Sequence, residues 1–199
     1  MQRHIKAGET IKVMDIIIRK ANKEEAQQIA ELFLLAWPVD EILESNAISY
    51  DQLFESITLI AAAEETIYSY ENTLVAEMDG KVVGAMCGYD GADYQRLKQP
   101  IVETLGPDSG FAQLKETETG ECYLDSVGVL PEFRGRGIAS RLFEAQCERA
   151  ASLGHKVAGL IVDVDKPQAE ALYARLGFVY LDDKDFFGHT MKHMVKTLL

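Results

Sequence analysis

The sequence predicts a single α/β domain whose sheet contains both parallel and antiparallel strands, and three observations support this prediction. The stretch Tyr123 to Leu142 reads as a strand, a glycine-rich joint and a helix that begins near Gly137. After that helix, the apolar run Val157 to Val162 completes a strand, helix, strand unit, which places its two strands parallel. The pair Asp79-Gly80 lies between two strand-like runs and indicates an antiparallel hairpin.

The length of the chain bounds the number of domains. The chain has 199 residues, of which 47% are hydrophobic, and this is enough for one substantial core. We therefore expect one domain over residues 14–199. Residues 1–13 are mixed and polar with no clear period, so they are expected to form an N-terminal tail. Met14 is a candidate for the natural start of the protein.

The formal net charge of −12 limits the classes of partner. Binding to duplex nucleic acid depends on many Lys and Arg contacts to phosphate, so nucleic acid is not expected as a partner. An acidic protein attracts cationic substrates, but acidic balance also simply keeps a protein soluble. The charge therefore argues against one class of partner without selecting another.

Cysteine and histidine spacing gives no sign of a disulfide framework or a metal site. Cys87, Cys122 and Cys147 are scattered, and buried reduced thiols in a cytoplasmic protein are the expected reading. His189 and His193 are four residues apart, but the sequence around them looks extended, so they do not share a helical face. The chain lacks the long apolar stretch of a membrane span and the apolar core of a signal peptide, so no membrane association is expected.

The first elements are predicted from periodicity and capping residues. Asp15 to Arg19 reads as a short strand. Asn22 to Glu25 resembles a capping box, and the apolar residues that follow it lie on one helical face. A second helix is expected from Tyr50 to about Ala63, after a serine cap. The segment Trp37 to Asn46 between the two helices is interpreted as a loop or a broken helix.

The middle of the chain combines a clear hairpin with a weak pattern. Thr73 to Met78 and Lys81 to Tyr89 are the two strand-like runs that the hairpin joins. Asp93 to Leu105 is expected to be helical, with an interruption at Pro100. Gly106 to Gly120 has no core-forming period. This irregular segment is either a lid that faces the substrate or a surface excursion without a role.

The last elements are a helix and a hairpin. Pro167 suits the first turn of a helix, and Gly177 suits its end. Phe178 to Leu181 then begins a strand. The polar run Asp182 to Asp185 is expected to form a turn, and Thr190 to Leu198 alternates enough to be the last strand.

The joint Arg134-Gly135-Arg136-Gly137 is suited to an anion. Its glycines allow a ligand to approach the first backbone N–H groups of the helix, and its arginines make the local charge positive. The joint lacks the Lys-Ser or Lys-Thr pair of a nucleotide-hydrolysing P-loop and the three spaced glycines of a dinucleotide fold. What remains is a pyrophosphate held by the N–H groups of a helix start.

Two elements of the chain resemble signatures of the GNAT acetyltransferase superfamily. The three fixed positions of its acyl-CoA signature are filled by Arg134, Gly137 and Ala139. The run Val127-Gly128-Val129 looks like the central strand of that family. Leu172-Tyr173 followed by Leu176-Gly177-Phe178 is similar to a second family element, in the right order and at the right separation. Lys166 departs from the pattern, because the family often has an Asn there.

The resemblance implies a mixed, mostly antiparallel central sheet that is split by a β-bulge near Val127 to Val129, with helices on both faces. Acetyl-CoA would lie in the resulting splay as acyl donor, with no metal. The main-chain groups of Val127 and Val129 would bind the pantetheine arm. The pyrophosphate would be held by the helix start, namely Arg134, Gly135, Arg136, Gly137, Ile138, Ala139 and Ser140.

The activity that the resemblance implies is N-acetyl transfer from acetyl-CoA to a primary amine by direct attack. Tyr173 would be the acid that protonates the departing thiolate, although a core tyrosine is the alternative reading. Asp125 is a candidate base, since it alternates with Val127 and Val129 along the strand, but a bulge between them would alter that geometry. The alternatives to Asp125 are Glu121, Asp163 and a chain of waters.

Two questions stay open from the sequence. A non-catalytic acyl-CoA-binding sensor or regulatory module is the alternative function, and Tyr173 distinguishes it from an enzyme. The acceptor is either a small molecule or a peptide amine, and a homodimer is left open. By their positions in the chain, the candidate residues for the wall of the acceptor site are Trp37, Tyr89, Asp90, Asp93 and Tyr94.

Overall fold

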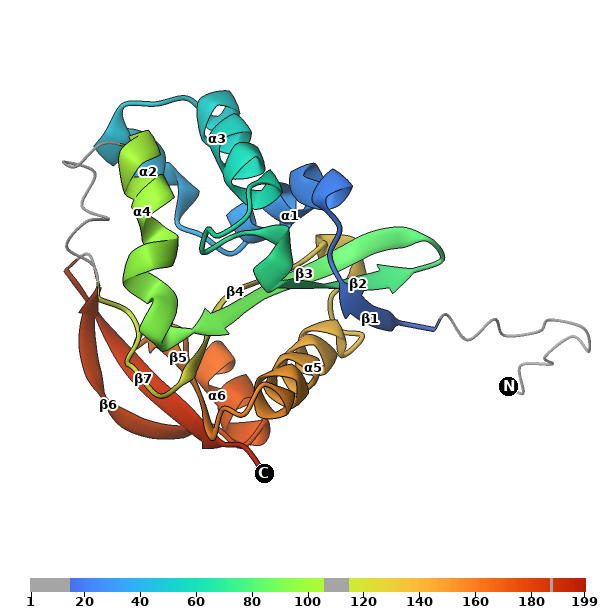
Figure 1. Ribbon diagram of the computed structural model, residues 1–199, viewed down its shortest axis with the longest axis vertical. Coiled ribbons are helices and arrows are strands. Elements are labelled where there is room, and N and C mark those ends of the chain that lie inside the picture. The colour runs from blue at the N-terminus through green and yellow to red at the C-terminus, as the bar shows by residue number, and fades with distance from the viewer. Residues whose placement is uncertain (1–14, 106–114, 187) are drawn as a thin grey trace, which may run out of the picture.

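The computed structural model describes residues 15–105, 115–186 and 188–199, which form one sheet with helices on both of its faces (Figure 1). The expected N-terminal tail, Met14 and the first part of the Gly106 to Gly120 segment lie outside the described residues. Across the sheet, the strands follow the order β1-β2-β3-β4-β5-β7-β6. Their bounds are β1 Ile17–Lys20, β2 Thr73–Met78, β3 Lys81–Asp90, β4 Cys122–Val129, β5 Val157–Asp163, β6 Val179–Phe186 and β7 His189–Thr197.

The sheet is mixed and mostly antiparallel, as the sequence predicts. The antiparallel pairs are β1 with β2, β2 with β3, β3 with β4, β5 with β7 and β7 with β6. The parallel pair is β4 with β5, joined by the helix that follows the glycine-rich joint. The fold class predicted from the sequence is therefore confirmed.

The helices form two layers (Figure 1). One face of the sheet carries α1 Ala26–Leu34, α2 Val39–Asn46, α3 Tyr50–Ala62 and α4 Tyr94–Leu105, and the other carries α5 Ile138–Ser152 and α6 Pro167–Arg175. Short 3-10 helices lie at Lys23–Glu25, Tyr70–Asn72, Gly91–Asp93 and Pro131–Phe133. Residues Phe33 and Leu142, from opposite layers, are fully buried, and each such side chain contributes about 2 kcal/mol of hydrophobic stabilisation.

Local sequence signals account for several of these boundaries. The backbone N–H of Asn22 donates to Glu25 Oε2 at 2.8 Å, and Ser49 Oγ accepts from the N–H of Gln52 at 3.2 Å, so both predicted caps are present. The hairpin between β2 and β3 turns at Asp79 and Gly80, whose φ angles of 49° and 80° are those that such a tight turn requires.

Two predicted elements need correction, and one open alternative is decided. The helical path breaks after α1 and resumes as α2 within Trp37 to Asn46, so the broken helix is confirmed and the loop is wrong. Helix α4 continues through Pro100, where an interruption was expected. The polar run Asp182 to Asp185 belongs to β6 and is not a turn. Because β6 is an edge strand, its outward positions accept charged side chains, so polarity there marks exposure and not a chain reversal.

Among the described residues, none of the helices is both long and apolar enough to span a bilayer.

Candidate active site

Strand β4 contains a β-bulge beside its buried carboxylate. Met86 of β3 pairs with Val127, but Gly88 pairs with Leu124, so one residue of β3 faces two residues of β4. Those two residues are Asp125 and Ser126. The bulge therefore lies just before the run Val127 to Val129, where the resemblance implied it.

The bulge leaves the consecutive residues Asp125 and Ser126 on one face of the sheet and so reverses the alternation of the strand after them. Val129 pairs with Gly84, where an added Cβ would lie 3.0 Å from Ile138 of α5, so Val127 and Val129 face α5. A Cβ at Gly128 would overlap the main chain of Leu32 in α1, on the other face. Asp125 lies on that α1 face. The expected alternation of Asp125 with the two valines is thus wrong, because the bulge separates them.

The open edge of β4 presents main-chain groups with no strand beside them. β4 pairs with β5 only at Cys122 and Tyr123, after which the two strands diverge. The N–H of Leu130 donates to the carbonyl of Val83 at 2.9 Å, which makes Val129 a non-hydrogen-bonded partner of Gly84. By the same register, the N–H and C=O groups of Val127 and Val129 point away from β3 toward the divergence.

The glycine-rich joint follows directly at the end of β4. Gly135 and Gly137 have φ angles of 74° and 77°, which favour glycine. The first helical hydrogen bond of α5 runs from the N–H of Arg141 to the carbonyl of Gly137 at 3.1 Å. Within the described part of the chain, the N–H groups of residues 135–140 donate no backbone hydrogen bond. The exposed start of a 15-residue helix therefore offers free donors to an anion.

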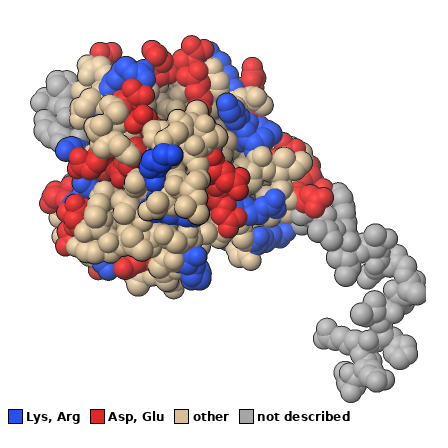
Figure 2. Space-filling model, turned by 60° about the horizontal axis from the view of Figure 1, so that its bottom comes forward, with Lys and Arg blue, Asp and Glu red and all other residues tan. Residues whose placement is uncertain are grey.

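The arginines of the joint have defined positions. Arg134 donates from Nε to the carbonyl of Val129 at 3.0 Å, and its own N–H donates to the carbonyl of Pro131 at 3.2 Å. Arg136 lies over the ring of Phe133 at 5.2 Å. On the side of the molecule shown in Figure 2, Lys and Arg side chains are interspersed with Asp and Glu around uncharged surface.

Tyr173 lies on the same face of the sheet as Val127 and Val129. Its ring makes an edge contact with Phe143 of α5 at 5.1 Å and lies 6.4 Å from the ring of Phe178. Among the described residues, the Tyr173 hydroxyl has no hydrogen-bond partner. Burial raises the pKa of this phenol above its ordinary value, so the hydroxyl keeps its proton at neutral pH.

Asp125 is held by hydroxyl groups on the opposite face. Tyr89 donates to Asp125 Oδ2 at 2.9 Å, and Ser126 donates to Oδ1 at 2.7 Å. Ser126 in turn accepts from Nε1 of Trp37 at 2.9 Å. Burial raises the pKa of Asp125, and the two hydroxyl donors only partly offset it. The structure thus brings a half-buried carboxyl with raised proton affinity next to aromatic side chains.

A second carboxyl, Glu116, joins this cluster and was missed by the sequence interpretation. It is buried and accepts from the hydroxyl of Tyr94 at 3.1 Å and from that of Tyr123 at 3.4 Å. Burial and the charge of Asp125 raise the pKa of Glu116 to about 8. No sequence signal could have found it, because Glu116 lies in a segment without hydrophobic period.

Of the candidate wall residues, three gather at Asp125 and two do not. Trp37, Tyr89 and Tyr94 surround the cluster, with the rings of Tyr89 and Tyr94 stacked at 6.4 Å. Asp90 accepts from the N–H of Ala92 at 2.9 Å, and Asp93 pairs with Arg96 at 3.3 Å. Those two carboxylates therefore organise the start of α4.

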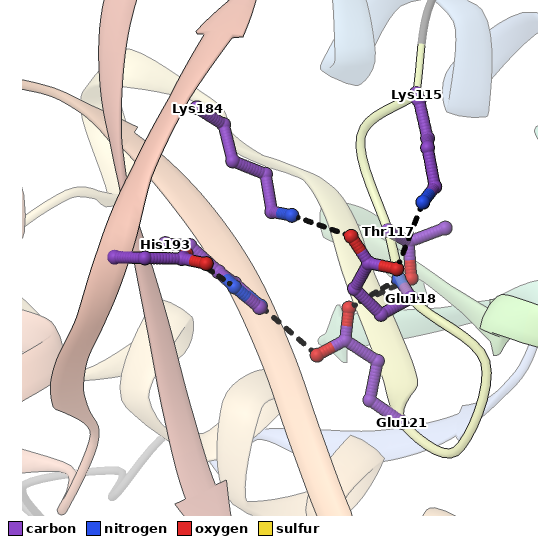
Figure 3. A network of polar contacts seen from close by, with 7 residues as sticks. Lys115, Thr117, Glu118, Glu121, Lys184 and His193 are labelled. Atoms are coloured by element: carbon purple, nitrogen blue, oxygen red, sulfur yellow. Dashed lines mark hydrogen bonds and ion pairs between the residues drawn. The ribbon is translucent and has the colours of Figure 1, made fainter.

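The alternative candidate bases are engaged elsewhere. Glu121 accepts from the hydroxyl of Thr117 at 2.8 Å and pairs with His193 Nε2 at 2.9 Å, in the network that Figure 3 shows. Burial raises the pKa of Glu121, but hydrogen bonds from His193 and its neighbours outweigh burial and leave the pKa lowered. Asp163 accepts from the N–H of Asp165 at 2.8 Å. Residues 15–105, 115–186 and 188–199 contain no group of three His, Cys, Asp or Glu side chains arranged for a metal ion.

Comparison with known proteins gives a consistent match. The family model described as the acetyltransferase (GNAT) family matches residues 27–178. The uncharacterized N-acetyltransferase YjgM of Escherichia coli (strain K12) is 34% identical over 109 residues, which are 48% of this chain and 65% of that protein. The aligned region therefore spans just under two thirds of the relative's length.

Solved structures share the fold over most of the chain. The crystal structure of an acetyltransferase is 33% identical, with a TM-score of 0.75, and covers 92% of this chain and 100% of that one. An aminoglycoside N-acetyltransferase in complex with CoA is 18% identical, with a TM-score of 0.60, over 89% of this chain and 97% of that one.

Proposed function

Because this chain belongs to the acetyltransferase (GNAT) family, we propose that it is an N-acetyltransferase that moves an acetyl group from acetyl-CoA to a primary amine. The observation that carries this proposal is the continuity of one unit of structure. The outward-turned main chain of Val127 and Val129 leads directly into the free N–H groups of residues 135–140. An extended arm that ends in a pyrophosphate needs both features side by side.

The cofactor site that we propose uses these residues in two parts. The N–H and C=O groups of Val127 and Val129 hold the pantetheine arm as an added strand would be held. The helix start from Gly135 through Ser140, which includes Arg136, Gly137, Ile138 and Ala139, holds the pyrophosphate through its N–H groups. Arg134 contributes its side chain, because its N–H already donates to Pro131. A solved structure of the same fold, an aminoglycoside N-acetyltransferase, is in complex with CoA, which supports CoA as the class of cofactor.

The reaction forms one bond, breaks another and moves two protons. Acetyl-CoA supplies the activated acyl group as a thioester. The amine nitrogen forms a bond to the acyl carbon, the bond from that carbon to sulfur breaks, and the sulfur takes a proton. We assign that proton to Tyr173, and this assignment is supported by its hydroxyl, which keeps its proton and has no hydrogen-bond partner among the described residues. Asp125 takes the proton that the substrate ammonium must lose before its nitrogen can attack, and the raised pKa of Asp125 suits this step.

The divergence of β4 and β5 explains how residues on opposite faces can act on one bond. Tyr173 lies on the α5 and α6 face, and Asp125 lies on the α1 face. The pairing of β4 with β5 ends at Tyr123, and we infer that the donor and the acceptor meet where the two strands separate. We infer that the donor enters along β4 and that the acceptor approaches from the side of Trp37, where aromatic rings and a carboxylate favour an ammonium group.

An amine panel tests the proposal. Isothermal calorimetry should detect acetyl-CoA binding, and thiol release should identify at least one accepted amine among polyamines, aminoglycosides, amino acids and peptides. Tyr173→Phe should keep acetyl-CoA binding and lose turnover about 100-fold or more. If acetyl-CoA does not bind, the proposal is wrong. If Tyr173→Phe binds acetyl-CoA and turns over as fast as the wild type, the acid assignment is wrong.

A sensor that binds acyl-CoA without turnover is the competing function, and unchanged cofactor binding with no turnover on any amine would favour it. A cytoplasmic location and a homodimer stay predictions. The three cysteines Cys87, Cys122 and Cys147 are free and buried, which agrees with a reducing compartment.

A further inference from the structure

Glu116 lies among the tyrosines of the α1 face and accepts hydrogen bonds from two of them, Tyr94 and Tyr123. The proposed reaction gives this carboxyl no role. We propose that Glu116 is a positioning residue for amine activation: Asp125 takes up the ammonium proton, and the nearby negative charge of Glu116 makes Asp125 a stronger proton acceptor. This inference rests on the proposed acetyl transfer, and it assigns a role to a residue that does not itself touch the acceptor.

A continuous set of contacts connects the two carboxyls. Glu116 accepts from the Tyr123 hydroxyl at 3.4 Å, and the ring of Tyr123 lies 5.8 Å from that of Tyr89. Tyr89 donates to Asp125 at 2.9 Å. The rings of Tyr89 and Tyr123, both buried, therefore lie between Glu116 and Asp125, and a low-dielectric surrounding screens the repulsion of two charges less than water does.

The groups that face Glu116 come from each packed element. Tyr94 and Lys98 face it from α4, Tyr89 from β3, Tyr123 and Asp125 from β4, and Tyr68 from the segment before β2. Lys98 is buried over the ring of Tyr94 at 4.8 Å, and burial lowers its pKa. The hydroxyls of Tyr94 and Tyr123 and the ammonium of Lys98 favour ionised Glu116, whereas burial and Asp125 oppose it more strongly.

The pair therefore ionises in two separated steps. The first negative charge resides on Asp125, which is half-buried and has two hydroxyl donors. The second ionisation places a like charge nearby in the same buried cluster, so it occurs near pH 8. An alkylamine has a pKa of about 10, whereas an isolated aspartate has one of about 4. A doubly ionised pair is thus a much better-matched acceptor for an ammonium proton than a lone aspartate.

The test is the pH profile of kcat/KM with one accepted amine and saturating acetyl-CoA. For the wild type, the acidic limb should reach half its plateau near pH 8. Glu116→Gln should move that midpoint down by about one pH unit or more and lower the plateau about tenfold, because a weaker base remains. Ionisation of the amine itself is common to both enzymes, so the difference between the profiles belongs to the protein.

Two further variants guard against a structural artefact. Tyr94→Phe removes a donor that favours ionised Glu116, so it should move the midpoint upward, opposite to Glu116→Gln. Glu118→Gln is the matched control, since Glu118 is in the same segment but pairs with Lys115 and Lys184. Its profile should match that of the wild type. Equal midpoints for the wild type, Glu116→Gln and Tyr94→Phe would overturn the inference.

A measurement without turnover separates this inference from the proposed function. The folded-state pKa of Glu116 is raised, so its contribution to the free energy of unfolding is present at low pH and declines as pH rises toward 8. Urea unfolding of Glu116→Gln should lack that decline. If the free energy of unfolding declines with pH equally in the wild type and in Glu116→Gln, the pKa of Glu116 is not raised and the inference is wrong. If the decline is lost but no amine is acetylated, the proposed function is wrong and the inferred role fails with it.

Discussion

Glu116 and Glu121 lie on the short segment that precedes β4, yet their pKa values are shifted in opposite directions. Both are buried, at 5% and 4% exposure. Burial and Asp125 raise the pKa of Glu116 to about 8. The pKa of Glu121 is lowered instead, because hydrogen bonds from His193, the N–H of Glu118 and Thr117 outweigh burial. Burial alone therefore does not decide the charge of a carboxyl.

The partners explain the difference. Glu121 accepts from Thr117 and from the N–H of Glu118 and pairs with His193 (Figure 3). His193 also pairs through Nδ1 with Asp182 at 3.0 Å. A ring with a carboxylate at each nitrogen donates from both and is therefore an imidazolium. The donors that reach Glu116 are two neutral phenols, and its nearest acid is Asp125. We infer that the cluster of Glu121, His193 and Asp182 (the Glu121 cluster) stabilises the fold. The cluster of Glu116, Asp125 and the tyrosines between them (the Glu116 cluster) is adapted to exchange a proton.

The largest expected effect is on activity at the Glu116 cluster. Asp125→Asn keeps the size of the side chain and removes the acceptor for the ammonium proton. We expect kcat/KM to fall by about 100-fold to 10,000-fold, which is the usual contribution of a general base. Calorimetric binding of acetyl-CoA should be unchanged, since Val127 and residues 135–140 are not altered. A variant with nearly wild-type turnover would show that solvent, and not Asp125, accepts the proton.

The next effect is on stability at the Glu121 cluster. Glu121→Ala leaves the His193 imidazolium buried without its inner anion, and we expect urea unfolding to show a loss of about 3 kcal/mol. Asp182→Ala is the matched control, because Asp182 pairs with the other nitrogen of the same ring but is 56% exposed. Its loss should be about 1 kcal/mol or less. Equal losses would mean that burial does not distinguish the two pairs.

A smaller effect concerns the titration of His193. The hydrogen bond to Glu121 raises the pKa of His193 above 6.5, although burial lowers it. Stability from this group is therefore complete below pH 6.5 and declines as pH rises through the raised pKa. Glu121→Gln should move the NMR titration midpoint of His193 down by about one unit, equivalent to about 1.4 kcal/mol. An unmoved midpoint would assign the shift to Asp182 instead.

Much of the fold could be predicted because its elements depend on local signals. Asp79-Gly80 determines a hairpin through φ angles that few residues adopt, and Pro167 and Gly177 bracket α6 through their own backbone preferences. The polar run Asp182 to Asp185 misled the prediction, since polarity on an edge strand and polarity in a turn look the same in one dimension.

The candidate site was predictable only where it is local. The glycine-rich joint is continuous in sequence, so its residues could be named in advance. The direction of Asp125 depends on the register between β3 and β4, which no short pattern encodes. Glu116 approaches Asp125 only through the tertiary packing of Tyr94 and Tyr123, so its partnership is a property of the folded chain.

The smallest expected effect concerns Trp37, which links the proposed acceptor site to Asp125 through Ser126. Trp37 donates to Ser126, which donates to Asp125, and the Trp37 ring also lies 4.8 Å from the ring of Tyr68. Trp37→Phe keeps a ring and removes the donor, which should cost about 1 kcal/mol of interaction and change kcat/KM a few-fold. The pH midpoint should stay in place, because Trp37 carries no charge and does not contact Glu116. A shifted midpoint would mean that Trp37 also influences the ionisation of Glu116 and Asp125. The difference between the pKa values of Glu116 and Glu121 would then depend on the aromatic rings around Asp125 as well as on the direct partners of each carboxyl.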